Sequence, residues 1–548
     1  MLTIKVEEQR IVVSGAPDHA RGMFNSIPAA LDRRNGVWWY PLSPFSMGRL
    51  SRKLSENDIP HIFGTGSNEI ISQMRNMLAK AKLKGTIEMP LVGYHTSTTP
   101  WHHQRLASGW MSTRPYAYLG MKMGTGKTLV AINELLIREP RTTLIMCPKS
   151  VIDVWVDEFS QHIEGSDHLI VPLKKGSSKF KAEYAASKQR DAVLMKRPAV
   201  FIVNYETAWR EHVAKWIVKM CPEVVIYDEA HRTKAPGSRI SRFAAKLFRL
   251  SGFRLLLSGT PLPNNQLDAY GQYRAMDPGI FGTNFSRFRA RYAEVATYKG
   301  FPEILSWRNQ EEFRNILKLT MFRVDDDVLD LPPITHVQRH TELPSKSRKL
   351  YEQIMDTFVA DVASGEVTAA NALTRLMKFQ QITSGFIIDD DGGHTDLDNE
   401  KEKALSDIID GVSGEPVVVF CRFRHDLMVI RKVADDHGRA YGEVSGSGNC
   451  LEGGKIPGGI DVLGVQIAAG GVGVNLNASR LCIFFSLGFS LAEYEQAVAR
   501  LHRGGQKSAV TVYHLIARDT VDEHIYAALA AKKKVVDEIM NYVKGERA

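Results

Sequence analysis

The chain has 548 residues, of which 44% are hydrophobic and 24% charged, and its formal net charge is +9. The apolar fraction excludes a mainly disordered chain, a collagen and a low-complexity scaffold. At roughly 100–200 residues per domain, the length predicts about three or four domains. No apolar run approaches the ~18 residues of a membrane span, so we expect no membrane partner.

The cysteines and the first residues indicate the compartment. The five cysteines are scattered and odd in number, which favours free thiols over a disulfide framework or a cysteine-based zinc site. Glu7 and Glu8 lie where a signal peptide would have basic and then apolar residues. We therefore expect a cytoplasmic protein. Its 70 Lys and Arg against 61 Asp and Glu allow an anionic partner without requiring one.

Residues 1–92 predict a small α/β domain with a basic balance. Short strands are expected at residues 3–6, 11–14 and 36–41, followed by a helix over residues 70–84. The first 90 residues hold 12 Lys and Arg against 8 Asp and Glu. This segment therefore carries +4 of the net charge.

The rest of the chain predicts two doubly wound α/β lobes. Short apolar runs separated by helical stretches are typical of buried parallel strands. We expect a first lobe over residues 93–335, a helical connector over residues 336–410 that ends in an exposed acidic loop at residues 389–398, and a second lobe over residues 411–548. The expected strands are residues 117–121, 143–146, 200–203, 224–227, 253–257, 416–420, 460–467, 481–485 and 510–516.

A phosphate-binding loop is predicted at residues 123–128 (MGTGKT), between an apolar strand and a helical run. Gly124, Thr125 and Gly126 let backbone N–H groups surround phosphates at a helix N-terminus. Lys127 would reach the β- and γ-phosphates, and the hydroxyl of Thr128 would bind Mg²⁺. The alternative is a glycine-rich loop that carries a surface lysine.

An acidic pair follows another apolar strand. Asp228 and Glu229 come at the carboxyl end of residues 224–227, the end that faces the ligand crevice in such a sheet. Asp228 is expected to hold Mg²⁺, and Glu229 to orient and deprotonate the attacking water. A lone acidic pair is more often a loop start or a helix cap, but the phosphate loop about a hundred residues earlier reverses that preference.

Three further motifs have open interpretations. Residues 258–261 (SGTP) end a third strand. Their hydroxyl groups either hydrogen-bond the acidic pair or belong to an ordinary turn. Residues 470–475 form either a phosphate-binding surface or a tight turn. Arg500 and Arg503, spaced i, i+3, would point from one face of a helix, either as arginine fingers or as part of a solvated basic face.

In this order, the motifs resemble those of superfamily 2 helicases and, within them, the Snf2-like ATPases. The resemblance covers residues 98–528. The motifs that carry it are residues 100–104 (PWHHQ), 124–128 (GTGKT), 144–150 (LIMCPKS), 228–231 (DEAH), 257–261 (LSGTP), 418–420 (VVF), 470–477 (GGVGVNLN) and 496–506 (QAVARLHRGGQ).

The resemblance implies two RecA-like lobes with ATP and Mg²⁺ bound between them. It makes Gln104 the residue that reads adenine, and it makes Arg500 and Arg503 catalytic residues together with Lys127 and Glu229. It also implies contacts with the nucleic-acid backbone, which we expect at Lys149, Ser150, Thr260, Arg422 and Gly471.

Some segments depart from the Snf2 pattern. Met121 and Lys122 stand where an Asp-Glu pair is usual, and residues 442–459 are short and glycine-rich. These departures weaken any transfer of a chromatin-remodelling role. Residues 376–385 are similar to compact bacterial and phage members, which implies a protein that acts on DNA in a bacterium or a phage-infected cell. Residues 27–42 resemble the substrate-recognition domain of HARP-type annealing helicases; a structural β-hairpin is the alternative.

The resulting prediction is a monomeric ATP-driven translocase on duplex or branched DNA, which remodels or anneals forks. A strand-separating helicase on DNA or RNA is the first alternative, because it would share every ATPase motif. A catalytically weak nucleic-acid-binding module is the second.

Overall fold

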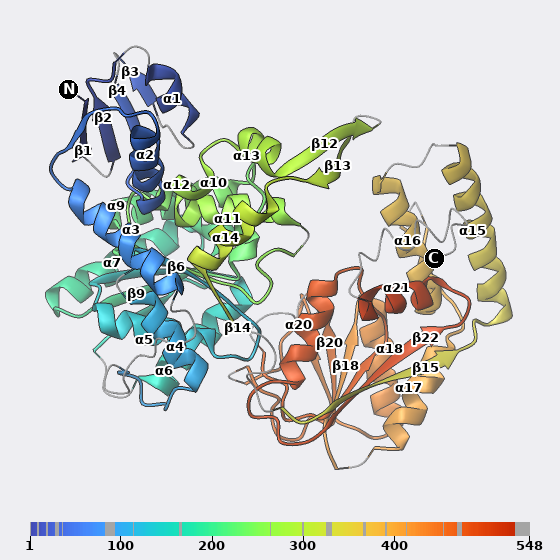
Figure 1. Ribbon diagram of the computed structural model, residues 1–548. Helices are drawn as coiled ribbons and strands as arrows, with labels where there is room; N and C mark the ends of the chain where they lie inside the picture. The colour runs from blue at the N-terminus through green and yellow to red at the C-terminus, as the bar shows by residue number, and fades with distance from the viewer. Residues whose placement is uncertain are drawn as a thin grey trace. The chain divides into compact units, whose positions relative to one another are not determined.

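The computed structural model describes most of the chain; the residues not described are 1, 8–9, 18–19, 28–31, 35–36, 83–93, 113, 164–166, 264, 299–300, 325–330, 365–368, 390–391, 413, 453, 468–473 and 532–548. The chain forms two compact units, Met1–Val328 and Leu329–Ala548 (Figure 1). Among the described helices, none is both long and apolar enough to cross a membrane.

The first unit begins with a small five-stranded sheet of order β3-β4-β2-β1-β5. Its pairs are antiparallel except for β1 with β5, and its core contains the buried side chains of Trp38, Tyr40 and Leu50. The strands expected here are present, as is the helix up to residue 82. The elements are β1 (Leu2–Glu7), β2 (Arg10–Ser14), α1 (Arg21–Ser26), β3 (Asp32–Arg34), β4 (Val37–Pro41), α2 (Pro44–Glu56), β5 (His61–Phe63) and α3 (Ser67–Lys82).

Helix α2 fastens this small sheet to the rest of the unit. The guanidinium of Arg49 donates hydrogen bonds to the carbonyls of Gly279 and Ile280, at 2.5 and 2.7 Å. The hydroxyl of Ser43 donates to the buried carboxylate of Asp277 at 2.6 Å. A Cβ at Gly279 would overlap the Ser43 side chain, so glycine permits this close approach. The N-terminal sheet is therefore packed onto the remainder of the first unit.

The main sheet of the first unit has seven parallel strands in the order β14-β6-β11-β10-β7-β9-β8. Strands β6, β9 and β11 are buried along their whole length, as expected for a sheet covered on both faces. The strands are β6 (Tyr116–Met121), β7 (Thr142–Cys147), β8 (Leu169–Pro172), β9 (Ala199–Asn204), β10 (Val224–Asp228), β11 (Phe253–Leu257) and β14 (Met321–Val324).

Helices connect these strands, and one hairpin projects from them (Figure 1). The helices of four or more residues are α4 (His102–Met111), α5 (Lys127–Arg138), α6 (Ile152–His162), α7 (Ser178–Leu194), α8 (Tyr205–Ala208), α9 (Glu211–Met220), α10 (Arg239–Leu247), α11 (Ala269–Met276), α12 (Pro278–Phe281), α13 (Phe285–Tyr292) and α14 (Gln310–Thr320), and the hairpin strands are β12 (Ala293–Tyr298) and β13 (Phe301–Trp307).

The second unit is built on a six-stranded parallel sheet of order β15-β22-β21-β18-β20-β19. The prediction of two α/β lobes with parallel sheets is therefore confirmed. The elements are β15 (Ile334–Thr341), α15 (Ser345–Ser364), α16 (Ala369–Thr383), β16 (Phe386–Ile388), β17 (His394–Asp396), α17 (Glu400–Asp410), β18 (Val417–Cys421), α18 (Arg424–Asp436), β19 (Tyr441–Val444), β20 (Val462–Gln466), β21 (Leu481–Phe484), α20 (Leu491–Leu501), β22 (Val510–Ala517) and α21 (Val521–Ala530).

The stretch expected to be helical also contains strands. β15 lies in the predicted connector but pairs with β22 as the edge strand of the second sheet. Most of its side chains are polar and exposed, so no apolar run marked it in the sequence. Part of the predicted acidic loop, His394–Asp396, is strand β17, paired with β16. Its side chains are exposed, so no apolar run marked this strand either.

A buried ion pair joins three helices of the second unit. The ammonium of Lys401 on α17 lies 2.5 Å from a carboxylate oxygen of Asp522 on α21, and the two side chains are 2% and 8% exposed. The hydroxyl of Thr383 on α16 donates to the other oxygen of Asp522. Lys401 also donates to the carbonyl of Phe485. The ion pair thus links α16, α17 and α21.

We expect Asp522→Ala to lower the free energy of unfolding of this unit by about 3–5 kcal/mol, because it leaves the Lys401 cation buried without its counter-ion. Chemical denaturation of the full chain measures the change. Lys403→Ala is the matched control, because Lys403 pairs with Glu400 at the surface, where such a pair contributes about 0–1 kcal/mol. Equal effects of the two substitutions would contradict the prediction.

Candidate nucleotide-binding site

Three strand ends of the first unit meet at one edge of its sheet. In the parallel register, Asp228 of β10 lies opposite Leu257 of β11, which in turn lies opposite Leu119 of β6. The loop after β6, the acidic pair after β10 and the residues after β11 therefore leave the sheet side by side. This edge is where ligands bind in open parallel sheets, and the predicted phosphate loop and acidic pair come together there.

The loop after β6 has the backbone expected of a phosphate-binding loop. Gly124 and Gly126 have φ of 78° and 75°, a left-handed conformation that favours glycine. The hydroxyl of Thr125 donates to the carbonyl of Lys122 at 2.6 Å and closes the loop on itself. Helix α5 starts at Lys127, so its first N–H groups and its positive end lie at the loop.

Gln104 of α4 supports this loop from the side. Its amide nitrogen donates to the carbonyl of Thr125 at 3.1 Å, while its amide oxygen accepts from the backbone N–H of Trp101 at 2.8 Å. The ring nitrogen Nε2 of His103 lies 2.9 Å from the same Thr125 carbonyl. Burial lowers the pKa of His103, which favours the neutral ring. The predicted adenine-reading residue is thus in direct contact with the phosphate loop.

Position 126 has no room for a side chain. A Cβ there would overlap the amide nitrogen of Gln104, and the φ of 75° disfavours any residue other than glycine. We expect Gly126→Ala to weaken ATP binding by at least about tenfold, measured with a fluorescent nucleotide, because the methyl group displaces the Gln104 amide from the loop and strains the backbone at φ of 75°. Gly237→Ala, in the same unit with nothing within 4 Å of its Cβ, should bind normally; tight binding by Gly126→Ala would refute the assignment.

Lys127 lies across the phosphate loop. Its ammonium donates to the carbonyls of Met121 and Lys122 at 2.9 and 3.0 Å. These bonds hold a positive charge at the place where a phosphate group would sit in a loop of this kind. Burial and Glu229 raise the pKa of Asp228 overall, and the Lys127 cation offsets part of that rise, so the cation and the acidic pair act on each other electrostatically.

Asp228 accepts hydrogen bonds from two other elements and from the residue that follows it. One carboxylate oxygen accepts from the indole N–H of Trp155 on α6 at 2.9 Å, and the other from the N–H of Glu229 at 3.0 Å. The hydroxyl of Tyr205 donates to the Asp228 carbonyl. Burial and the neighbouring Glu229 raise the pKa of Asp228, whereas the Trp155 bond lowers it. The indole thus favours the charged carboxylate.

Glu229 occupies a left-handed backbone conformation with φ of 50°, and it is only 7% exposed. Its carboxylate lies 3.3 Å from Nδ1 of His231, and that nitrogen lies 3.2 Å from the hydroxyl oxygen of Ser258. The Ser258 oxygen accepts from the N–H of Thr260 at 3.1 Å. The end of β11 is therefore connected to the acidic pair through His231, whereas the sequence had predicted only direct hydrogen bonds from the hydroxyl groups of residues 258–261.

The second unit carries the predicted arginine motif at the end of α20. Helix α20 ends at Leu501, so Arg500 lies in its last turn but Arg503 lies in the turn that follows. Arg503 is therefore outside the helix, so helix geometry does not place the two arginines on one face. The helix stops at Leu501, whose carbonyl accepts a hydrogen bond from the Gln506 amide.

The predicted nucleic-acid contacts lie in different environments. Lys149 and Ser150 are exposed in the short turn after β7, and Thr260 is half-buried after β11. Arg422 donates to the Gln380 side chain at 2.5 Å and lies 4.2 Å from the Phe489 ring centroid, so its guanidinium has partners within its own unit. Gly471 lies outside the described residues.

Some functional neighbours were not recognisable as such from the sequence. No contact of Trp155 or Tyr205 with the acidic pair was predicted, and His103 had no role of its own. An indole or phenol that donates to a strand end from a distant helix has no local sequence signal. The parallel strand order that brings these residues together is needed to find them.

The donor groups suit a nucleotide triphosphate with Mg²⁺. The oxygen atoms of Thr128 and Asp228 are the donor type that Mg²⁺ prefers. Lys127 and the N-terminus of α5 offer positive charge to phosphate, and the glycines at positions 124 and 126 leave the backbone accessible. The residues present therefore fit the group that this loop type binds.

Comparison with known proteins gives the same picture along the chain. Residues 103–385 match the model of the SNF2-related domain. Residues 400–505 match the helicase conserved C-terminal domain. Together these two segments contain both the phosphate loop with its acidic pair and the arginine motif.

Several curated relatives are similar to this chain. Protein p41 of Acyrthosiphon pisum secondary endosymbiont phage 1 is 27% identical over 457 residues, which is 79% of this chain and 95% of that protein. Chromodomain-helicase-DNA-binding protein 1-like of Mus musculus is 28% identical over 77% of this chain. DNA repair and recombination protein RDH54 of Saccharomyces cerevisiae is 24% identical over 74% of it. The match spans only 47% of each of the last two proteins.

One solved structure with a similar chain is the Sulfolobus solfataricus SWI2/SNF2 ATPase core in complex with dsDNA. It has a TM-score of 0.38 and 20% sequence identity, and the match covers 83% of this chain and 95% of that one.

Proposed function

Because the chain belongs to the SNF2-related family of helicase-like ATPases, we propose that it is an ATP-driven motor that moves on duplex or branched DNA. The observation that carries the proposal is the meeting of phosphate loop, lysine and acidic pair at one sheet edge. Lys127 lies at the loop carbonyls, and Asp228 is held by Trp155 and Glu229. All the residue types needed for hydrolysis are present.

The roles follow from the chemistry of each group. Gly124, Thr125 and Gly126 bind the phosphates through backbone N–H groups, and Lys127 neutralises their charge. Thr128 and Asp228 would hold Mg²⁺, which neutralises charge on the phosphate oxygens when bound. Glu229 orients the attacking water and accepts its proton, and His231 keeps the Glu229 carboxylate in place. Gln104, the residue expected to read adenine, hydrogen-bonds the Thr125 carbonyl of the loop.

Arg500 and Arg503 complete the proposed catalytic set. A guanidinium stabilises the charge that develops on a transferred phosphoryl group, and one such residue contributes on the order of 10³-fold in rate. The proposal therefore includes strong loss of hydrolysis in Arg503→Ala with nucleotide binding retained.

DNA is the proposed partner because two relatives carry DNA in their names, one as a DNA-binding protein and one as a repair and recombination protein. We propose fork remodelling or annealing as the output, with the basic N-terminal sheet reading the DNA structure. Arg49 and Ser43 pack this sheet onto the remainder of the first unit, so the sheet would move together with the ATPase residues. Such a construction suits a recognition domain that directs a motor.

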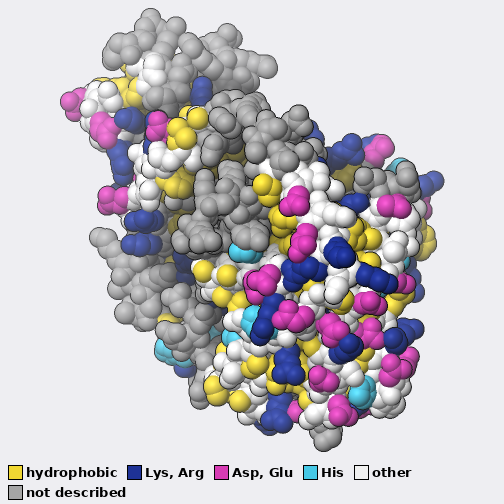
Figure 2. All heavy atoms as spheres, turned by 90° about the vertical axis from the view of Figure 1, so that its right-hand side faces the viewer, with side chains coloured by type: hydrophobic (Ala, Val, Ile, Leu, Met, Phe, Trp, Pro, Cys, Tyr) yellow, Lys and Arg dark blue, Asp and Glu magenta, His cyan; other side chains and the backbone are white. Residues whose placement is uncertain are grey.

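The net charge offers a partial guide to the DNA-binding surface. On the face that Figure 2 shows, Lys and Arg side chains are interspersed with Asp and Glu over the described surface. The +9 of the whole chain therefore does not gather into a single-sign patch on this face. Phosphate contacts by scattered cations would still make binding salt-dependent.

The test is the ATPase rate of the full chain with single-stranded, duplex, forked and four-way DNA and with RNA, at one stated salt concentration. The proposal expects strong stimulation by duplex or branched DNA. Stimulation by RNA alone, or none by any nucleic acid, would overturn it. A strand-displacement assay then separates the translocase from a strand-separating helicase: ATPase stimulation by duplex without displacement supports the translocase.

A further inference from the structure

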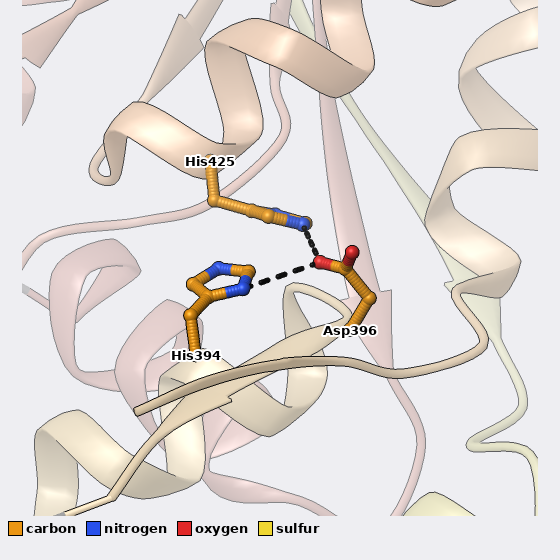
Figure 3. A group of neighbouring side chains, drawn as sticks. All are labelled: His394, Asp396 and His425. Atoms are coloured by element: carbon orange, nitrogen blue, oxygen red, sulfur yellow. Dashed lines mark hydrogen bonds and ion pairs between the residues drawn. The ribbon is translucent and has the colours of Figure 1, made fainter. Parts of the chain in front are cut away.

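A second group of chemically active side chains lies outside the nucleotide site, in the second unit. His394 and Asp396 are on β17, and His425 is in the first turn of α18 (Figure 3). One ligand atom from each residue lies within 4.8 Å of the others. Oδ1 of Asp396 is 3.2 Å from Nε2 of His425 and 3.5 Å from Nδ1 of His394. The three side chains point toward one another (Figure 3).

The local fold explains how these residues meet. His394 and Asp396 are two apart on a strand, so their side chains share one face. The β16–β17 register pairs Asp396 with Phe386 of β16. The N-terminus of helix α18 is capped by Asp426, whose carboxylate accepts a hydrogen bond from the N–H of Phe423 at 3.1 Å. This start sets His425 opposite the hairpin.

An aromatic ring holds both imidazoles in place. Phe386 is 2% exposed, and its ring centroid lies 4.4 Å from that of His425 and 5.4 Å from that of His394, with interplanar angles of 24° and 13°. Both histidine rings therefore stack on the same phenyl ring. Stacking restricts their rotation, so less side-chain entropy is lost when the two nitrogens bind a common ligand.

The two histidines differ in their exposure. The His425 side chain is only 10% exposed, and its Nδ1 has no hydrogen-bond partner among the residues that the structure describes. Asp396 is 77% exposed and His394 is 41% exposed. The group thus opens to solvent on one side, where an ion can enter.

The two separations that involve Asp396 match a metal site in size, and all three side chains are of a suitable donor type. In a tetrahedron with bonds of about 2.0–2.1 Å, two ligand atoms are about 3.3 Å apart. The two nitrogen–oxygen distances here, 3.2 and 3.5 Å, lie on either side of that value. Two imidazole nitrogens exclude Mg²⁺ and Ca²⁺ as the favoured ions, because these ions prefer oxygen donors.

We propose that His394, Asp396 and His425 bind one divalent transition-metal ion, with zinc as the best fit and a water molecule as its fourth ligand. The ion would fasten the β16–β17 hairpin to the start of α18. Residue Arg422, an expected nucleic-acid contact, lies three positions before His425 and bonds to Gln380 of α16. A metal ion here would thus order the hairpin and the start of the helix that follows this arginine.

The test uses the full-length protein after chelator treatment, without nucleotide and with excess Mg²⁺ to occupy carboxylate sites. Zn²⁺ is titrated calorimetrically, and Co²⁺ is titrated with the visible absorption of its d–d bands as readout. We expect one tightly bound equivalent and an upward shift in melting temperature with Zn²⁺. Asp396→Asn and His394→Ala, at exposed positions, should each weaken binding by at least about tenfold and remove the melting shift.

His437→Ala is the matched control. Like the proposed ligands, His437 lies near a carboxylate, 3.8 Å from Asp410, and it hydrogen-bonds Ser406. Among the described residues it belongs to no three-residue group of metal-ligand side chains. The variant should bind Zn²⁺ like the wild type. No saturable binding, unchanged binding by Asp396→Asn, or a thiolate charge-transfer band that indicates cysteine ligands would each overturn the proposal. Nucleotide is absent throughout, so the result does not depend on the ATPase assignment.

Discussion

Replacement of Lys127 by alanine is expected to reduce ATP hydrolysis by at least about 10²–10³-fold, because it removes a cation that lies on the phosphate loop itself. The Lys127 ammonium lies within hydrogen-bond distance of the Met121 and Lys122 carbonyls. Without it, two loop carbonyls lose a donor, and bound phosphate loses its neutralising charge. Steady-state phosphate release in the presence of saturating duplex DNA measures the effect.

The matched control for Lys127→Ala is Lys215→Ala. Lys215 lies on α9 of the same unit, is 74% exposed and pairs with exposed Glu211. Circular dichroism of both variants should match the wild type. Turnover near the wild-type rate in Lys127→Ala would remove the basis for an ATP-driven motor and would leave the catalytically weak nucleic-acid-binding module as the better account.

Replacement of Glu229 by glutamine is expected to preserve ATP binding and to slow hydrolysis by about 10²–10⁴-fold, the usual contribution of a general base. Glutamine has almost the same shape, so the contact with His231 and the backbone of the strand end remain possible. What is lost is the ability to accept a proton from water. Equilibrium binding and single-turnover hydrolysis, measured on the same preparation, separate the two effects.

Glu206→Gln provides the control for Glu229→Gln. Glu206 follows β9, a strand of the same sheet, but its carboxylate is 48% exposed and pairs with Arg232. It should hydrolyse ATP normally. Normal steady-state hydrolysis by Glu229→Gln would refute the general-base assignment without affecting the phosphate loop, whereas loss of ATP binding would assign Glu229 a role in holding the nucleotide.

Much of the fold could be predicted from local patterns in the sequence. Buried strands such as β9 and β11 appear in the sequence as continuous apolar runs because both faces of a parallel sheet are covered. Edge strands could not be predicted in this way. Strand β15 has mostly polar, exposed side chains, and only its pairing with β22 identifies it as a strand.

The nucleotide site was also accessible in part. Gly124 to Thr128, Asp228 and Glu229 were predicted because a glycine-rich loop and an acidic pair, each directly after an apolar strand, are together typical of a nucleotide site. The partners of these residues were not predicted. Trp155, Tyr205 and His231 contact the acidic pair from other elements or positions, and nothing in their own neighbourhoods specifies that contact.

The sequence by itself determined which residue types are available for phosphate binding and hydrolysis, and in which order they occur, because such motifs are contiguous along the chain. The tertiary structure alone decided which of them share a site and what surrounds them. The end of α20 between Arg500 and Arg503 and the meeting of His394 and His425 depend on where elements distant in sequence come to lie. Contacts of that kind are set by packing and strand order, which no local pattern records.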